Sequence, residues 1–178
     1  MPPFATAYSR RLLLWGFGLV AVPSLALLAV PRRKRVLNLF VIERSKNRNV
    51  VRYDLVLDAS GFYDARRPLD VYWLMLAEDG RREELSLLEQ RAYGFELLPN
   101  AKPNELGVRL VALKNRPLMV RGGGGSYRAE LSIQGVPAYL ESVFVATREG
   151  PIYPTVLYIE LRGRAVHDRR ALSERIQK

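Results

Sequence analysis

The chain has 178 residues, of which 48% are hydrophobic, and it carries a formal net charge of +10. The hydrophobic content excludes general disorder, and the length predicts one domain with short appendages. The sequence contains no cysteine, which excludes disulfides, thiolate nucleophiles and cysteine-based metal sites.

The positive charge is concentrated at the amino terminus. Six of the 28 Lys and Arg residues, and none of the 18 acidic residues, lie within residues 1–35. The remainder therefore has 22 basic and 18 acidic side chains, a balance that is ordinary for a soluble domain. Nucleic-acid binding needs a basic footprint over the domain itself. We therefore expect no nucleic acid among the partners.

Residues 12–30 form an uncharged apolar run of 19 residues. This is close to the roughly 20 residues that a membrane-spanning helix needs. Basic side chains beside such a run contact lipid headgroups. The sequence therefore predicts that residues 1–35 are a membrane anchor or export signal with one transmembrane helix, and that residues 36–178 form a globular domain. The predicted membrane-surface residues are Arg32, Arg33, Lys34 and Arg35.

Two properties of this segment stay open. A basic segment followed by an apolar run fits both a cleaved signal peptide and a retained anchor, and Ser9-Arg10-Arg11 also resembles a twin-arginine export signal. The length of the run favours retention. The basic cluster at residues 32–35 favours a cytoplasmic domain by the positive-inside rule, whereas an export signal favours the opposite side. We expect a single-pass protein of the bacterial inner membrane with a periplasmic domain.

The rest of the chain is dominated by short stretches in which apolar and polar residues alternate. The clearest is residues 127–134, where Tyr127, Ala129, Leu131 and Ile133 alternate with polar side chains. Residues 82–93 predict a helix, and residues 168–176 a second, shorter one. The pattern indicates a mainly β fold, an antiparallel barrel or sandwich of about eight strands with one or two short helices. The predicted strands are residues 37–42, 51–57, 71–77, 94–98, 107–113, 118–121, 127–134, 139–147 and 155–165.

Three segments carry a family resemblance: ERSKNRNVVRYD at residues 43–54, PLDVYW at 68–73 and AYG at 92–94. Over about residues 36–165 the chain resembles an uncharacterised bacterial family of exported or membrane-anchored domains, one of the domain-of-unknown-function groups. The resemblance implies a β-rich extracytoplasmic domain. It implies no activity.

The loop at residues 44–49 is the first candidate site. It combines three cations with two asparagines, and successive turn amides can form an anion-binding concavity. We expect an acidic partner, a phosphate or a lipid headgroup to bind there, on one side of the loop. The alternative is a polar hairpin whose asparagines cap the turn. The residues concerned are Arg44, Lys46, Asn47, Arg48 and Asn49.

Three aromatic residues form the second candidate, a ligand pocket in a barrel mouth: Tyr53, Tyr72 and Trp73. Large aromatic side chains in strands also pack commonly in cores. The run Gly122–Gly125 lacks the Lys and Ser/Thr of a phosphate-binding loop and indicates a flexible hairpin. His167 is the only histidine, and neither a catalytic triad nor a metal-binding motif surrounds it.

These features predict a non-catalytic protein without metal or cofactor. We expect a membrane-tethered interaction domain, an accessory or structural subunit that contacts the lipid bilayer and docks on a membrane protein complex. The alternative is a periplasmic β-barrel that binds a small, lipid-like ligand.

Overall fold

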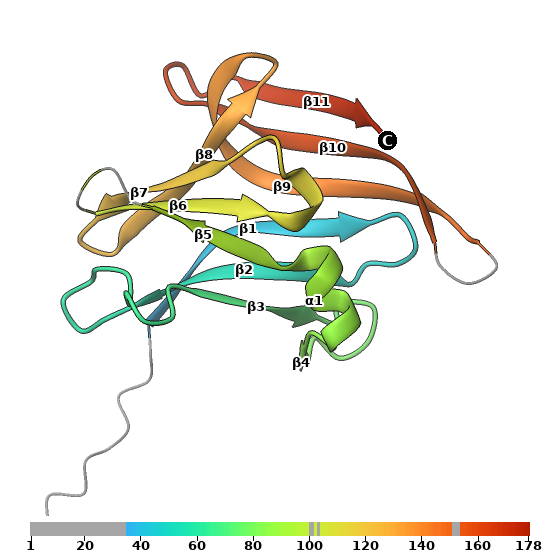
Figure 1. The fold of residues 1–178 in the computed structure, drawn as a ribbon, viewed down its shortest axis with the longest axis horizontal. Coiled ribbons are helices and arrows are strands. Elements are labelled where there is room, and N and C mark those ends of the chain that lie inside the picture. The colour runs from blue at the N-terminus through green and yellow to red at the C-terminus, as the bar shows by residue number, and fades with distance from the viewer. Residues whose placement is uncertain (1–34, 100–101, 103, 151–153) are drawn as a thin grey trace, which may run out of the picture. The chain divides into compact units, whose positions relative to one another are not determined.

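Residues 35–99, 102, 104–150 and 154–178 are described by a computed structural model of the chain (Figure 1). The predicted transmembrane helix and the basic residues Arg32, Arg33 and Lys34 lie outside this range. No helix in the described ranges is long and apolar enough to cross a bilayer.

The described part is built almost entirely of β-strands. In chain order the elements are β1 (Arg35–Arg44), β2 (Val50–Leu57), β3 (Leu69–Leu74), β4 (Arg82–Glu84), α1 (Leu87–Tyr93), β5 (Phe95–Leu98), β6 (Glu105–Leu110), the 3-10 turn η1 (Val111–Leu113), β7 (Leu118–Gly123), β8 (Ser126–Ile133), β9 (Val136–Arg148), β10 (Thr155–Ala165) and β11 (Ala171–Gln177).

The strands form one curled sheet in the order β4-β3-β2-β1-β9-β8-β7-β6-β5, and β10 and β11 extend from β9. The long strand β9 controls this shape. One of its edges pairs with β8 at residues 136–139 and then with β1 at residues 142–145, while β10 occupies the other edge. Because β8 and β1 share one edge of β9, the sheet divides there into two diverging halves (Figure 1).

The pairing of β1 with β9 is parallel, whereas every other pairing between strands is antiparallel. The prediction of a mainly β fold is confirmed. The expected antiparallel barrel or sandwich is corrected to a mixed sheet that curls into a half-barrel. Sequence pattern could not reveal this, because the parallel contact joins residues about 100 positions apart, such as Ser45 and Thr147, whose separation is 102.

The concave side of the sheet holds the hydrophobic core. In β8 the buried positions alternate with more exposed ones, as the period of two requires. The rings of Phe40 and Tyr53 stack with their centroids 4.5 Å apart, and both side chains are almost fully buried. Apolar side chains therefore fill the concave interior around this pair.

The two predicted helices differ from the structure. Residues 82–84 form strand β4 on the edge of β3, and only residues 87–93 are helical. The reason is a capping box, in which Ser86 and Glu89 each satisfy the other's backbone N–H and start the helix there. The predicted helix at residues 168–176 is wrong, because residues 171–177 form β11 along β10.

Candidate functional site

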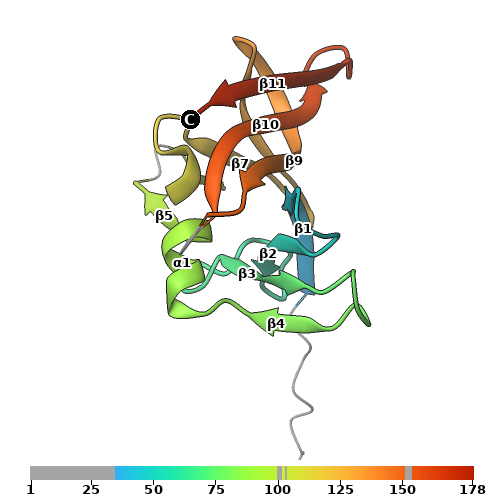
Figure 2. The same ribbon diagram turned by 90° about the vertical axis from the view of Figure 1, so that its right-hand side faces the viewer.

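An apolar groove of about 530 Å³ opens at the end of the domain where β1 finishes and β10 begins. This is the end that faces the viewer in Figure 2, with α1 beside it. The volume lies in the range of small-molecule sites, about 300–1,000 Å³. The groove is lined by apolar side chains from five elements, among them Ile42, Leu88, Val111, Val145, Val156 and Ile159.

Four cations line the same groove: Arg44, Lys46, Arg91 and Lys178. No Asp or Glu is among the described lining residues. Lys46 forms an ion pair with Glu149 at 3.6 Å, but both side chains are largely exposed, so this pair is weak. The groove therefore combines an apolar wall with a positive rim.

Arg44 is the cation held most firmly. It ends β1 on the same face as Phe40 and Ile42, which turns its side chain toward the inside of the curled sheet. Its guanidinium lies over the ring of Trp73, 4.2 Å from the centroid. This cation–π contact fixes the position of the charge.

Glu89 connects Trp73 to the cap of α1. The indole Nε1 of Trp73 donates a hydrogen bond of 2.9 Å to Glu89 Oε1, and the other carboxylate oxygen accepts from the backbone and hydroxyl of Ser86. Desolvation favours the neutral acid, but these hydrogen bonds and the charge of Arg44 together lower the pKa of Glu89. Glu89 is thus a charged carboxylate whose oxygens are already occupied.

The loop at residues 44–49 divides into two roles. Arg44 and Lys46 line the groove, whereas Arg48 is exposed and does not line it. Asn49 is 4% exposed, and its Oδ1 accepts a 2.8 Å hydrogen bond from the backbone of Ala77. Asn47 Oδ1 accepts from the backbone of Asn49 at 3.2 Å. The asparagines therefore hold the turn, and only two of the three cations face the groove.

The three aromatic residues expected to share one pocket are separated. Tyr72 and Trp73 are neighbours on β3, so their side chains project from opposite faces of the sheet. Tyr53 is fully buried in the core, and its hydroxyl donates to the backbone carbonyl of Tyr93. None of the three lines the groove. This part of the prediction is corrected: the aromatics pack in the core or in a polar network.

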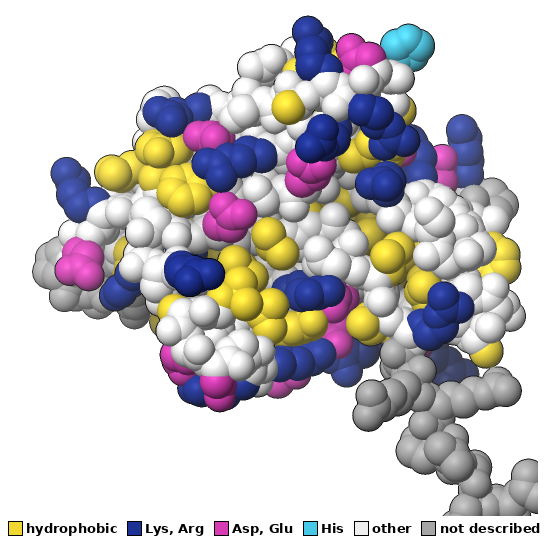
Figure 3. All heavy atoms as spheres, turned by 180° about the vertical axis from the view of Figure 1, so that it is seen from behind, with side chains coloured by type: hydrophobic (Ala, Val, Ile, Leu, Met, Phe, Trp, Pro, Cys, Tyr) yellow, Lys and Arg dark blue, Asp and Glu magenta, His cyan; other side chains and the backbone are white. Residues whose placement is uncertain are grey.

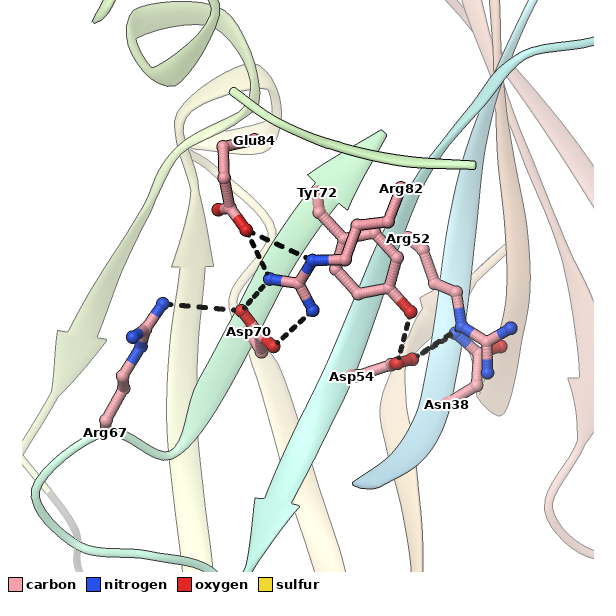
Figure 4. A network of polar contacts seen from close by, with 8 residues as sticks. All are labelled: Asn38, Arg52, Asp54, Arg67, Asp70, Tyr72, Arg82 and Glu84. Atoms are coloured by element: carbon pink, nitrogen blue, oxygen red, sulfur yellow. Dashed lines mark hydrogen bonds and ion pairs between the residues drawn. The ribbon is translucent and has the colours of Figure 1, made fainter. Parts of the chain in front are cut away.

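The polar network lies on the other face of β1, β2 and β3 (Figure 4). Asp54, which is 1% exposed, accepts hydrogen bonds from Asn38 Nδ2 (3.0 Å), Arg52 Nε (2.8 Å) and the hydroxyl of Tyr72 (2.8 Å). Burial and the bond to Asp54 raise the pKa of Tyr72 to about 12. The buried carboxylate is fully paired, so the network joins three strands.

A second ion-pair cluster continues the network toward β4. Arg82 makes two hydrogen bonds to Asp70, of 2.8 and 3.0 Å, and two to Glu84, of 2.6 and 3.1 Å. The sequence signal for both clusters was a charged or polar residue at every second position of adjacent strands. Because the sheet was expected to bury only one face, this spacing could have predicted a polar surface on the opposite face.

The remaining candidates have simpler positions. Gly122 and Gly123 end β7, Gly124 and Gly125 form the turn to β8, and His167 is exposed in the turn between β10 and β11. Within the described ranges no group of three or more His, Asp and Glu side chains is arranged to hold a metal ion. On the face seen in Figure 3, basic and acidic side chains are interspersed with apolar ones.

Comparison with known proteins places the chain in one family. No curated protein matches it, and no solved structure matches it. A family model described as a domain of unknown function matches residues 40–175, which is most of the chain. The expected resemblance is confirmed, and the matched region contains the three motifs at residues 43–54, 68–73 and 92–94. The chain therefore belongs to the domain-of-unknown-function family DUF4833.

Proposed function

We propose that this protein is a non-catalytic binding domain, tethered to a membrane by residues 1–35, and that the groove is its binding site. The observation that carries the proposal is the groove itself, in which an accessible apolar wall meets four cations. Concave, mainly apolar surfaces with a few charged groups are the usual form of a ligand site.

The polar residues elsewhere support binding rather than catalysis. An acid–base catalyst needs a titratable group that reaches a substrate. Asp54 is buried with three hydrogen-bond donors, and Glu89 is occupied by the helix cap and Trp73. Both carboxylates thus maintain the fold, and neither lines the groove.

The tether gives the groove a defined place of action. An anchored domain meets its ligand in or near a bilayer, where its effective concentration is raised by confinement. In the accessory-subunit form of this proposal, a membrane protein partner fills the groove. In the ligand-binding form, an amphiphile from the membrane fills it. The size of the groove favours the small ligand.

The test is site-specific photo-crosslinking of the full chain in native membranes. A photoreactive amino acid replaces Val156, which is 36% exposed on the groove wall. The control replaces Phe62, which is 40% exposed in the loop between β2 and β3 and does not line the groove. We expect an adduct, identified by mass spectrometry, at position 156 only. Absence of an adduct there, or equal labelling at both positions, would contradict the proposal.

A further inference from the structure

We infer that the ligand of the groove is a single-chain amphiphile with an anionic headgroup, such as a fatty acid or an alkyl phosphate. The acyl chain lies along the apolar wall and the headgroup oxygens contact the cations. This inference rests on the proposed function, because it names the class of ligand for the same groove.

The wall has the form that an acyl chain requires. Its floor is made of Ile42, Val145 and Ile159, which are almost completely buried by their neighbours. Its lip is made of apolar side chains that remain in water, with Leu88 56% and Val156 36% exposed. A chain of methylene groups placed between floor and lip would release water mainly from the lip, and removal of water from apolar surface is the main favourable contribution to binding an apolar group.

The cations define the sign of the headgroup. They come from separate segments: Arg44 from β1, Lys46 from the following loop, Arg91 from α1 and Lys178 directly after β11. The described lining residues include no acidic side chain to balance them. A cationic ligand would be repelled, and a neutral one would leave the positive rim unused.

Arg44 supplies a second, independent observation. Its Nε is buried and has no hydrogen-bond partner among the described residues. A buried donor without an acceptor costs free energy, so such donors normally have a partner in the functional state. A carboxylate or phosphate oxygen at the groove is the acceptor that an arginine favours.

The position of Glu89 explains why this donor is not satisfied from within the domain. Its two oxygens accept hydrogen bonds from Trp73 and Ser86, and no hydrogen bond joins it to Arg44. Arg44 is thus held over the ring of Trp73 in a fixed orientation, and its Nε has no acceptor from Glu89. Such preorganisation lowers the entropy that a ligand loses on binding.

The experiment uses the full chain in vesicles of phosphatidylcholine. Three photoreactive probes share one twelve-carbon chain and differ only in the headgroup: carboxylate, phosphate or alcohol. Labelled residues are located by mass spectrometry. We expect the two anions to label the groove about tenfold more strongly than the alcohol, a ratio that corresponds to about 1.4 kcal/mol. The ratio of carboxylate to phosphate labelling distinguishes a fatty acid from a phosphorylated lipid.

Two pairs of variants link the labelling to the groove. Ala92→Trp fills the groove from the exposed face of α1, and Leu87→Trp adds the same side chain on the same helix at a position that does not line it. We expect the first to abolish groove labelling by the anionic probes and the second to preserve it. Labelling that persists in Ala92→Trp would overturn the inference.

The charge variants test the headgroup without filling the groove. We expect the double variant Lys46→Gln/Arg91→Gln to reduce the preference of the groove for the anions, while Arg44 and Lys178 preserve part of it. The control Arg66→Gln/Arg109→Gln removes the same charge away from the groove and should leave the preference unchanged. Equal labelling by all three probes in the unmodified chain refutes the anionic ligand. If the three probes label equally but a protein adduct forms at position 156, the groove still functions as a binding site. In that case only the amphiphile is excluded as its ligand.

Discussion

Replacement of Asp54 by asparagine tests whether the polar network holds the sheet together. Asn has the shape of Asp, but it loses the charge and presents an NH2 group where an acceptor oxygen stood. Three donors converge on the carboxylate, from Asn38 on β1, Arg52 on β2 and Tyr72 on β3. The substitution therefore removes the charge that all three donors contact, and an NH2 group in place of Oδ2 would require the hydroxyl of Tyr72 to accept instead of donate.

The expected cost follows from the exposure of each partner. The side chain of Arg52 is 33% exposed, so water replaces much of what it loses. Tyr72 is 9% exposed, and its hydroxyl loses a charge-assisted bond with little access to water. Bonds to charged groups contribute about 1.5–3 kcal/mol each, and breaking a buried charge network costs about 3–5 kcal/mol. Because Arg52 is partly hydrated, we expect a loss near the lower limit, about 3 kcal/mol.

Urea denaturation of the full chain, followed by circular dichroism, measures this loss. With a denaturant dependence of about 2 kcal/mol per molar urea, the midpoint should fall by about 1.5 M. The control is Asp70→Asn, whose partner Arg82 is 41% exposed, and there we expect a loss of about 1 kcal/mol or less. If Asp54→Asn unfolds within about 0.5 kcal/mol of the unmodified chain, the network does not hold the sheet.

Three further outcomes are expected. Gly122→Ala should cost more than about 2 kcal/mol in urea denaturation, because a Cβ there would lie 2.0 Å from the backbone oxygen of Ser126, whereas Gly123→Ala, which meets nothing within 4 Å, should be neutral. Equal stability of the two variants would contradict the close approach. The hydrogen bond from Arg116 lowers the pKa of Glu174 in the folded state, so the stability from this pair is present above about pH 4.5, the ordinary glutamate value, and is lost as the pH falls through the lower folded value. Glu174→Gln should therefore be less stable at neutral pH and should lose less on acidification, and an unchanged acid profile would argue against the pair. Tyr53→Phe removes the hydroxyl that donates to the end of α1. Hydrogen exchange in α1 should therefore speed up by about tenfold, equivalent to about 1.4 kcal/mol, while exchange in β8 is unchanged. Equal protection of α1 in Tyr53→Phe and in the unmodified chain would show that the bond is not needed.

The strands were predictable because one-face burial leaves a local signal. Residues 127–134 alternate between buried and more exposed positions in the structure, as the sequence pattern indicated. The same reasoning predicted β1 and β9 as strands but not their parallel pairing, since that pairing depends on which distant strand occupies an edge. No property of residues 41–44 or 142–145 alone specifies that neighbour.

The helix at residues 168–176 was predicted wrongly because Leu172 and Ile176 fit two patterns. Their spacing of four places them on one face of a helix, but it also places them on one face of a strand. Leu172 is buried and Ile176 is partly buried against the core, while Ser173 and Arg175 between them are exposed. The pairing with β10 therefore decided between two patterns that the sequence could not separate.

The candidate groove was predictable only in part. Arg44 and Lys46 were identified because they lie in a short, basic turn. Arg91 and Lys178 were missed, because they reach the groove from segments far away in the sequence. A groove assembled from five elements has no contiguous motif, so its position depends on how the sheet curls.

The parallel contact between β1 and β9 also affects how the domain is made. Until residues 142–145 have been synthesised, one edge of the first strand has no partner, and β2 alone covers the other. At about 5–20 residues per second, the ribosome exposes this unpaired edge for several seconds. Non-local pairing of this kind also slows folding after release. Because β1 cannot complete its pairing until β9 has been made, the protein is most vulnerable to aggregation during its own translation, when the concave apolar face is still open.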